Sequence, residues 1–385
     1  MLAPKNAARI VAGTLVLLCI ILFAVRVRKE MEDFQVNNKA GARLTWGETL
    51  YRAEDGHYQF KYPPFAAVIY APLAGLPLPT AKAIWFGLIL SATIGAFALA
   101  LRSASDKSKA GAWAAWVPLI VLGRYFLREI ELGQINAIIT FLLLAMIGLL
   151  ALAEEKDAPG AELGAGVLWG LSVALKPYAL IFLPYLLLKK KLRTLAAGTG
   201  ALAAAFMIPA IFYGFKGSLT VHLEWVRTLS QSTPGLLTSQ DNASLLALFA
   251  KWTGRPDLAF RLWLAGLVVL GVATLLAVRR GRRQENPVPL DGGLLLLLIP
   301  LVSPLGWDYT FLSAILAVAL VSRRFRDLPA VLRVASAASF VVIPLSLYDL
   351  LGRRTYAQFM SLSVVTICFL VLTAAVLALR FKDVR

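Results

Sequence analysis

Runs of about 20 apolar residues recur along this chain, and they restrict its fold more than any other feature, because a helix needs about that length to cross a bilayer. The firm runs are residues 80–101, 113–127, 135–153, 194–213, 257–278, 329–347 and 359–379. An earlier run, residues 8–25, follows Lys5 and Arg9 and has no small-residue cleavage pattern at its end. We therefore expect a retained membrane anchor there rather than a cleaved signal peptide.

The composition excludes most soluble classes of protein. Of the 385 residues, 59% are hydrophobic and 16% are charged, and the mean hydropathy is +0.72. A soluble domain has about a quarter of its residues charged. Pro and Gly are unclustered and there are only two cysteines, which excludes disordered, collagen-like and disulfide-rich chains. The predicted fold class is an all-α polytopic membrane protein.

Two further apolar runs contain a polar break. Residues 161–188 are interrupted at Lys176-Pro177-Tyr178, and residues 290–322 at residues 305–308. If the first run crossed the membrane once, the basic clusters at 189–193, 279–283 and 323–326 would all lie outside, against the excess of Lys and Arg in cytoplasmic loops. Two short helices at each break, returning to the same side, keep all three clusters cytoplasmic. This predicts about 12 helices in one unit, residues 1–385, with both termini on the cytoplasmic side of the plasma (inner) membrane.

The net charge of +17, from 39 Lys+Arg and 22 Asp+Glu, divides into two groups. About half of the basic residues fall on the predicted cytoplasmic turns and tails, where they set orientation. These clusters lack interleaved aromatic residues and any nucleic-acid fold signature, so the expected partner is the lipid bilayer and no nucleic acid. Many of the others lie on predicted outside loops, where topology does not explain them: Arg26, Arg28, Lys29, Lys39, Arg43, Arg52, Lys61, Arg124, Arg128, Lys216 and Arg227.

The short helices predict a cavity. Each half on either side of a break has about 11–15 residues, or roughly 17–22 Å at the rise of an α-helix, whereas the hydrocarbon core is about 30 Å thick. Irregular backbone at that depth is tolerated only inside protein or along a wet cavity. The two junctions carry Lys176 and Asp308, and buried charges of this kind indicate either a functional site or a structural ion pair. In both cases a polar cavity opening outward is expected.

A long extracytoplasmic loop, residues 26–78, is predicted before the run at 80–101. Glu32-Asp33-Phe34 follows the first predicted span, and residues 36–44 can form a short helix. Residues 65–76, bounded by Pro63-Pro64, are too short for a confident span and predict an interfacial helix. From its position alone, Asp33 is ordinarily a solvated carboxylate.

Several short motifs follow one another over residues 26–310. They are Asp33-Phe34, Gly47 with Leu50-Tyr51, Phe60-Lys61-Tyr62-Pro63-Pro64, Gly133-Gln134-Ile135-Asn136, Lys176-Pro177, Asp241-Asn242-Ala243-Ser244 and Ser303-Pro304-Leu305-Gly306-Trp307-Asp308. Their order and topological placement resemble glycosyltransferase family 87, the polyprenol-phosphate-sugar-dependent enzymes that include mycobacterial mannosyltransferases. The resemblance implies the multi-helix GT-C fold.

The resemblance also implies a reaction. A hexose or pentose, with mannose as the leading choice, would be transferred from a polyprenyl-phosphate donor to a hydroxyl of a glycolipid or glycan on the extracytoplasmic side. The transfer would invert the anomeric configuration. Asp33 matches the family's catalytic aspartate and would be the general base, since one carboxylate suffices for a single displacement. The chain departs from the family pattern at Asn37-Asn38, where tyrosines are common, and at Tyr309, where histidine is common. These departures bear on the acceptor and the sugar more than on the reaction type.

Two chemical classes of residue are candidates for binding the substrates near Asp33. Lys176, with outside arginines such as Arg124 and Arg128, is expected to bind the donor phosphate, because a leaving phosphate needs positive charge or a metal. Gln134 and Asn136, at the outer start of a helix, would hydrogen-bond sugar hydroxyls. They would equally well cap that helix.

Aromatic and motif residues complete the predicted substrate site. Trp307 or Tyr62 would stack on a sugar face, or would belong to the aromatic belt at the membrane interface. The remaining predicted substrate-binding residues are Asn242, Asp308 and Tyr309.

No cofactor or metal site is predicted, and the sequence does not decide a divalent metal requirement. His57 and His222 each lack a second ligand at metal-binding spacing. Cys19 and Cys368 lie in apolar runs and are interpreted as packing residues. The main alternative function is a transporter or flippase for a lipid-linked or anionic solute, since broken helices and buried charge also serve carriers. A pseudoenzyme of cell-envelope assembly is a third hypothesis, in which Asp33 would be dispensable.

Overall fold

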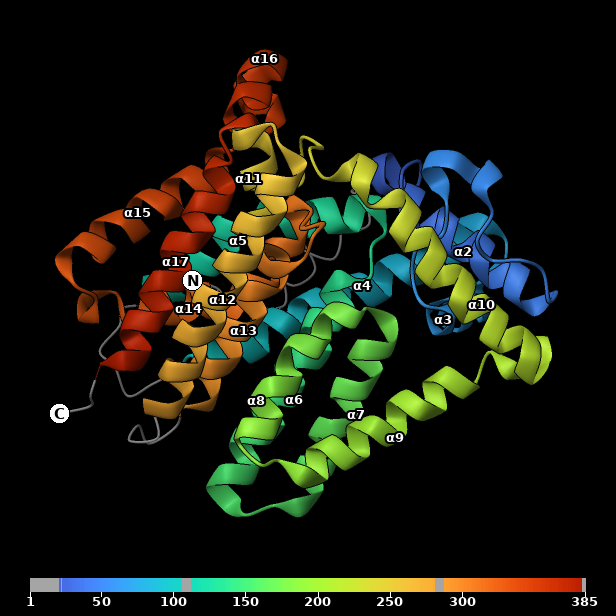
Figure 1. The fold of residues 1–385 in the computed structure, drawn as a ribbon, viewed down its shortest axis with the longest axis horizontal. Coiled ribbons are helices and arrows are strands. Elements are labelled where there is room, and N and C mark those ends of the chain that lie inside the picture. The colour runs from blue at the N-terminus through green and yellow to red at the C-terminus, as the bar shows by residue number, and fades with distance from the viewer. Residues whose placement is uncertain (1–20, 22, 106–111, 281–286, 383–385) are drawn as a thin grey trace, which may run out of the picture.

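The computed structural model describes residue 21 and residues 23–105, 112–280 and 287–382, and in these ranges it contains helices, connecting segments and one isolated bridge but no strand (Figure 1). The α-helices are α2 (Glu32–Thr45), α3 (Pro64–Ala74), α4 (Leu78–Ser103), α5 (Val117–Leu132), α6 (Asn136–Lys156), α7 (Pro159–Leu175), α8 (Leu183–Leu188), α9 (Leu192–Met207), α10 (Ala210–Ser232), α11 (Leu245–Thr253), α12 (Pro256–Arg280), α13 (Val288–Val302), α14 (Ile315–Arg323), α15 (Ala330–Leu345), α16 (Tyr348–Ser361) and α17 (Val364–Phe381). Shorter π or 3-10 segments are η1 (Phe23–Val27), η2 (Ala53–Tyr58), η3 (Ala112–Ala115), η4 (Pro177–Phe182), η5 (Pro234–Leu236), η7 (Asp308–Ala314) and η8 (Phe325–Asp327).

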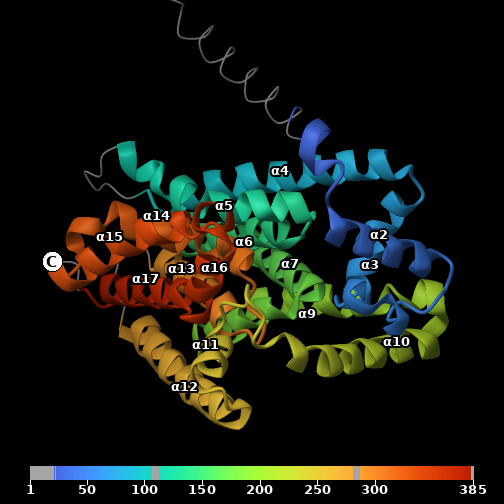
Figure 2. The same ribbon diagram turned by 90° about the horizontal axis from the view of Figure 1, so that it is seen from above.

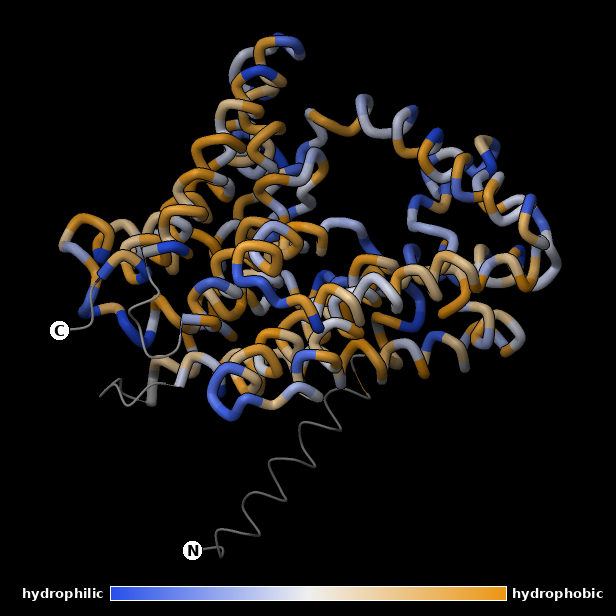
Figure 3. The backbone as a smooth tube through the Cα atoms, turned by 60° about the horizontal axis from the view of Figure 1, so that its bottom comes forward, coloured by the Kyte–Doolittle hydropathy of each residue, from blue (hydrophilic) through white to orange (hydrophobic). Residues whose placement is uncertain are grey.

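The all-α membrane fold predicted from the sequence is confirmed. Among the described helices, α4, α6, α12 and α17 are each long and apolar enough to cross a membrane, and two bent pairs bring the number to six if each pair is one span. Apolar residues run along the helices while hydrophilic ones gather in the connecting segments (Figure 3). The count of about 12 helices stays a prediction. Most of the first predicted span, residues 8–25, lies outside the described residues, as does Cys19.

The loop predicted at residues 26–78 folds into a lobe built on α2 and α3, which pack against each other. Their backbones approach closely at Gly41, where an added Cβ would lie 2.7 Å from the carbonyl carbon of Tyr70. Tyr70 and Phe34 are fully buried between them, together with Trp85 from α4. The short helix predicted at residues 36–44 is therefore part of the longer α2, which begins four residues earlier and packs against α3.

The apolar run at 161–188 is broken as predicted. Helix α7 ends at Leu175, Lys176 is extended (φ −147°, ψ 118°), and the chain continues through η4 into α8. Just beyond α8, the Lys191 ammonium pairs with Glu154 at the end of α6 (3.2 Å) and with Glu162 at the start of α7 (3.3 Å). Because these partners lie at the opposite end of α7 from Lys176, the run returns to the end at which it began.

The second broken run, at 290–322, also returns. Helix α13 ends at Val302, and η7 begins at Asp308 and leads into α14. Asp291, in the first turn of α13, pairs with Arg380 near the end of α17 (2.6 Å). Asp327, just after α14, pairs with the adjacent Lys382 (2.9 Å). Both ends of the run therefore lie beside the last turn of α17, and Lys189 joins them 3.6 Å from Asp291.

Two helix pairs bend sharply. Residues 194–213, predicted as one span, are divided: α9 ends at Met207 and α10 leaves it at 95°. Pro209 lacks an N–H and cannot continue the helical hydrogen bonds, which is the physical reason for the break. The pair α15 and α16 bends by 109°. In Figure 2, α10 runs toward the lobe of α2 and α3, while α4 and α12 lie on opposite sides of the bundle.

Candidate functional site

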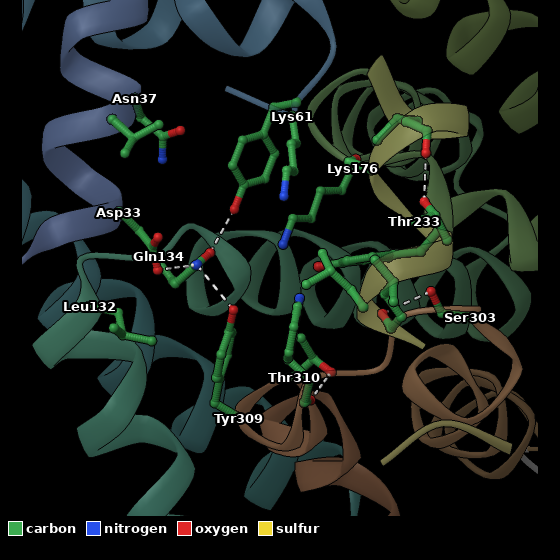
Figure 4. A pocket seen from close by; sticks show the side chains of 18 of the residues that line it. Asp33, Asn37, Lys61, Leu132, Gln134, Lys176, Thr233, Ser303, Tyr309 and Thr310 are labelled. Atoms are coloured by element: carbon green, nitrogen blue, oxygen red, sulfur yellow. Dashed lines mark hydrogen bonds between the residues drawn. The ribbon is translucent and has the colours of Figure 1, made fainter. Parts of the chain in front are cut away.

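A cavity of about 500 Å³ lies where segments distant in the sequence meet (Figure 4). Its walls come from α2, from residues 57–63, from the α5–α6 junction, from the break at 176–178, from the last turns of α10 and from residues 299–310. Both helix breaks therefore border one cavity, at the opposite end of the helices from the Lys191 and Asp291 ion pairs. The predicted polar cavity is present and both junctions border it, while its outward opening stays a prediction.

Asp33 stands in the first turn of α2, half-buried in the cavity wall. The backbone of Met31 before it is left-handed (φ 63°), and its N–H donates to the Glu131 carbonyl (2.9 Å), which ties the start of α2 to the end of α5. Burial raises the pKa of the Asp33 carboxyl above its usual 3.8, and the hydrogen bond from Gln134 and the positive charge of Lys176 oppose that rise. A carboxylate of raised pKa is a stronger base than an exposed one.

The amide of Gln134 joins three walls of the cavity. Its nitrogen donates to the Asp33 carboxylate (2.6 Å) and to the Tyr309 hydroxyl (3.1 Å), while its oxygen accepts from the Tyr62 hydroxyl (2.6 Å). Gly133 just before it has φ +72°, and a Cβ there would lie 2.6 Å from the Cβ of Phe34. A glycine is thus needed to turn the chain after α5 and aim Gln134 at Asp33.

Two lysines from different elements extend into the cavity (Figure 4). The Lys176 ammonium donates to the Asn136 side-chain oxygen (2.6 Å) and lies 4.8 Å from the ring centre of Tyr62. Lys61 comes from the loop before α3, and the indole of Trp225 on α10 donates to its carbonyl (3.1 Å). Burial lowers the pKa of Lys61 and the charge of Asp33 opposes that shift. Two ammonium groups near a carboxylate can hold an anionic group beside a base.

The predicted arginines lie in two different settings. Arg128 lines the cavity, pairs with Glu131 (2.9 Å) and keeps half of its side chain exposed. Arg124 lies behind the wall, where it forms an ion pair with Asp308 and donates to the hydroxyl and carbonyl of Ser346. The alternative that a junction charge belongs to a structural ion pair therefore holds for Asp308, whose partner is the neighbouring Arg124.

Asn242 fixes the loop that carries Trp307. Its side-chain oxygen accepts from the backbone N–H groups of Gly306 (3.0 Å) and Ser244 (3.2 Å), and its nitrogen donates to the carbonyls of Leu237 and Pro304. A Cβ at Gly306 would lie 2.1 Å from the Pro300 carbonyl oxygen, so this turn needs glycine. The two motifs around Asn242 and Trp307 meet as an isolated antiparallel bridge.

The structure thus gathers most of the predicted site residues and separates three of them. Those in the cavity wall are Asp33, Tyr62, Arg128, Gln134, Lys176, Trp307, Asp308 and Tyr309. Arg124, Asn136 and Asn242 lie behind it, bonded to other residues. Sequence reasoning omitted Lys61 and Trp225 from the site. Lys61 had a signal, because it stands inside a quoted motif and among the unexplained outside charges, whereas nothing in the sequence distinguished Trp225.

No three His, Cys, Asp or Glu side chains in the described part of the chain form a group that could hold a metal ion. His57 lines the cavity, and His222 packs its ring against Phe206 instead. Cys368 is buried, consistent with its interpretation as a packing residue.

The chain matches a family model over most of its length. Residues 60–304 match the model described as glycosyltransferase family 87. The chain belongs to glycosyltransferase family 87. The matched segment contains Lys61, Gln134, Lys176 and the start of the Trp307 loop, while Asp33 precedes it.

Curated relatives of this family 87 chain carry the same description in two species. The polyprenol-phosphate-mannose-dependent alpha-(1-2)-phosphatidylinositol mannoside mannosyltransferase of Mycobacterium tuberculosis is 26% identical over 348 residues, which cover 85% of this chain and 78% of the relative. The protein of that name from Mycolicibacterium smegmatis is 26% identical over 357 residues, with the same two shares.

Among solved structures, the chain is similar to ArnT from Cupriavidus metallidurans. The form bound to undecaprenyl phosphate superposes with a TM-score of 0.43 at 13% identity and covers 99% of this chain and 78% of that one. The apo form gives a TM-score of 0.40 at 15% identity, with shares of 97% and 78%.

Family membership makes this protein a membrane glycosyltransferase, as predicted. Its apolar helices make it an integral membrane protein. Membership in an enzyme family also favours catalysis over the alternative of a transporter or flippase.

Proposed function

We propose that this family 87 enzyme transfers mannose from a polyprenyl-phosphate donor to a hydroxyl of a glycolipid or glycan, with inversion, on the extracytoplasmic side of the plasma membrane. Asp33 is the proposed general base. The observation that carries the proposal is the meeting of the Asp33 carboxylate with Lys61 and Lys176 in one cavity between two helix breaks. The donor specified in the names of the mycobacterial relatives supports the polyprenyl-phosphate and the mannose.

The proposed reaction is a single displacement. Asp33 takes the proton of the acceptor hydroxyl as its oxygen bonds to the anomeric carbon, and the bond from that carbon to the phosphate oxygen breaks on the opposite face. Its electron pair leaves with the polyprenyl phosphate. The ammonium groups of Lys61 and Lys176 offset the negative charge that grows on this leaving group.

The remaining wall residues are proposed to recognise the substrates. Gln134 and Tyr309 offer an amide and a hydroxyl beside Asp33, where acceptor or sugar hydroxyls would bond. Trp307 is half-buried in the wall and suits stacking on a sugar face. Tyr309 replaces a histidine common in the family, so we assign it to recognition of the acceptor.

The proposed orientation rests on charge. The clusters at 189–193 and 323–326 lie at the end of the helices opposite to the cavity, because their neighbours Glu154, Glu162, Asp291 and Asp327 pair there. The excess of Lys and Arg on cytoplasmic loops makes that end cytoplasmic. The cavity and Asp33 then face the extracytoplasmic side, and both termini are cytoplasmic.

The test is the substitution Asp33→Asn, which keeps the shape of the side chain and its bond to Gln134 while removing the base. Membranes holding the variant are incubated with radiolabelled polyprenyl-phosphate mannose, and label is followed into the endogenous acceptor. We expect a loss of at least about 100-fold, since a positioned base contributes about 10²–10⁴-fold to rate. The control is Asp157→Asn, an exposed aspartate in the α6–α7 turn at the other end of the molecule.

Full transfer by Asp33→Asn would overturn the role of Asp33 as the general base, whereas no transfer by the unsubstituted protein would support the pseudoenzyme hypothesis. Movement of labelled donor across the membrane without label in any acceptor would support the carrier. An unchanged melting temperature of the variant shows that the loss is not a loss of folding.

A further inference from the structure

A carboxylate that the proposed reaction does not use is buried behind the cavity. Glu129, in the last turn of α5, is 0% exposed. One of its oxygens accepts from the Ala137 backbone N–H (2.8 Å) and the other from the Asn136 side-chain nitrogen (2.8 Å). It is not among the residues that line the cavity. An ionisable group in such surroundings is costly and therefore indicates a role.

The contacts of Glu129 continue to the cavity through one side chain. Asn136 is 1% exposed and turns its nitrogen toward Glu129 and its oxygen toward Lys176, whose ammonium donates to it (2.6 Å). The order is therefore carboxylate, amide, ammonium, and only the last group reaches the cavity.

The direction of the hydrogen bonds from Lys176 through Asn136 to Glu129 follows from the chemistry of the two end groups. A carboxylate only accepts hydrogen bonds and an ammonium only donates them, so the amide between them has one favourable orientation. If Glu129 were a donor, the amide of Asn136 would turn over and present its N–H₂ group to the ammonium. Lys176 would then lose its acceptor and its nearest compensating charge behind the wall.

We propose that Glu129 is a positioning residue that, through Asn136, holds the Lys176 ammonium in the cavity to receive the phosphate of a lipid-linked substrate. This inference rests on the proposed function, in which Lys176 binds that phosphate. It also assigns Asn136, expected from the sequence to contact sugar, to the support of Lys176.

The competing explanation is structural. Glu129 accepts from Ala137 in the first turn of α6 and thereby caps that helix. The variant Glu129→Gln separates the two explanations, because its amide oxygen still accepts from Ala137 while its N–H₂ group faces Asn136. The variant therefore keeps the helix cap but reverses the direction of the hydrogen bond between residue 129 and Asn136.

The experiment measures binding of a short-chain polyprenyl phosphate, the proposed leaving group, to the purified full-length protein in detergent. This readout needs neither the acceptor nor catalysis. We expect Glu129→Gln to raise the Kd about 10–100-fold, because the loss of a hydrogen bond to a charged group typically weakens binding by about that factor. We expect Lys176→Met to raise it at least as much, and Glu129→Gln to add little in the Lys176→Met background.

A matched rescue keeps the inference falsifiable even if the single variant folds poorly. In the double variant Glu129→Gln with Asn136→Asp, the glutamine donates to the new carboxylate, which also accepts from Lys176, and the net charge is unchanged. We expect this pair to recover most of the affinity, and Asn136→Asp alone to be as weak as Glu129→Gln, since it sets two carboxylates face to face.

Each outcome decides something. If Glu129→Gln binds normally while Lys176→Met does not, or if the double variant binds no better than the single ones, the inference about Glu129 is overturned and the proposed function stands. If Lys176→Met also binds normally, the role of Lys176 in the proposed function fails with it. If only Asp33→Asn behaves unexpectedly, the base is reassigned and the Glu129 inference stands.

Discussion

A single amide sets the electrostatics around the proposed base. Gln134 donates to Asp33 and to Tyr309 and accepts from Tyr62, so all of its side-chain groups are engaged within the cavity wall. The bond to Asp33 favours the charged carboxylate and opposes the effect of burial on its pKa. The protonation of Asp33 should therefore respond to changes at Gln134.

We predict that Gln134→Ala moves the acid limb of the pH profile to higher pH. As the proposed general base, Asp33 acts only when ionised, so we expect kcat/KM to fall as the pH drops through the pKa of that carboxyl, which burial already raises above 3.8. Loss of the hydrogen bond raises this pKa further. Rates of mannosyl transfer across about pH 4 to 8 check the shift. The control is Gln35→Ala, a substitution on α2, the helix that carries Asp33. If the acid limb of the Gln134→Ala profile does not move, Gln134 does not influence the pKa of Asp33.

At the residue scale, the motifs indicate most of the groups that line the cavity but not Glu129 behind its wall. Asp33, Lys176 and Gln134 stand in short motifs, so the sequence marked them. Glu129 stands at the end of an apolar run beside Arg128 and Glu131, where it resembles any charge at a helix end. The role proposed for it depends on Lys176, which follows the end of a different helix, α7, and only the folded structure brings the two together through Asn136.

At the scale of elements, the lobe that carries Asp33 depends on the close approach of α2 and α3. We predict that Gly41→Ala lowers the stability by about 1–3 kcal/mol, because the new methyl group would overlap the α3 backbone and force the helices apart. The melting temperature in detergent measures this loss. Gly87→Ala is the matched control, since a Cβ there meets nothing within 4 Å. Equal melting temperatures for the two variants would contradict the prediction.

The sequence predicted the two broken helices better than the bent ones. At Lys176-Pro177 a charge and a proline interrupt an apolar run, and the basic clusters required the chain to return, which the Lys191 and Asp291 ion pairs confirm. The run at 194–213 contains a proline too, but no charge, so the sequence predicts one straight span there. Its 95° bend places α10 against the cavity, which explains why Trp225 was missed.

At the scale of the whole molecule, the ion pairs at one end and the cavity at the other define two faces. We predict opposite accessibility for cysteines introduced at Glu54, in the lobe beside the cavity, and at Glu155, at the end of α6. With Cys19 and Cys368 replaced by serine, a membrane-impermeant maleimide added to intact cells should label Glu54→Cys, and should label Glu155→Cys only after lysis. The reverse pattern would invert the proposed orientation.

The fold class and the gathering of the motifs were predictable because apolar length and charge placement act through the bilayer, which every helix experiences alike. The number of helices is harder to predict from the sequence. Short and bent helices such as α8, α10 and α16 fit neither a full crossing nor a loop, and their course depends on what packs around them.

The shortness of the broken helices has a kinetic consequence. With 17 and 15 residues, α7 and α13 rise about 25 Å and 22 Å, less than the roughly 30 Å of hydrocarbon, so a helix of either length that starts at one membrane face ends below the opposite headgroups. The isoprenoid chain of the proposed polyprenyl-phosphate donor can then stay in the lipid throughout turnover. Lifting it out would cost about 0.8 kcal/mol per CH₂ group. For the proposed donor, supply would then be diffusion in two dimensions, and we expect the rate to follow the mole fraction of donor in the membrane rather than its amount in the cell.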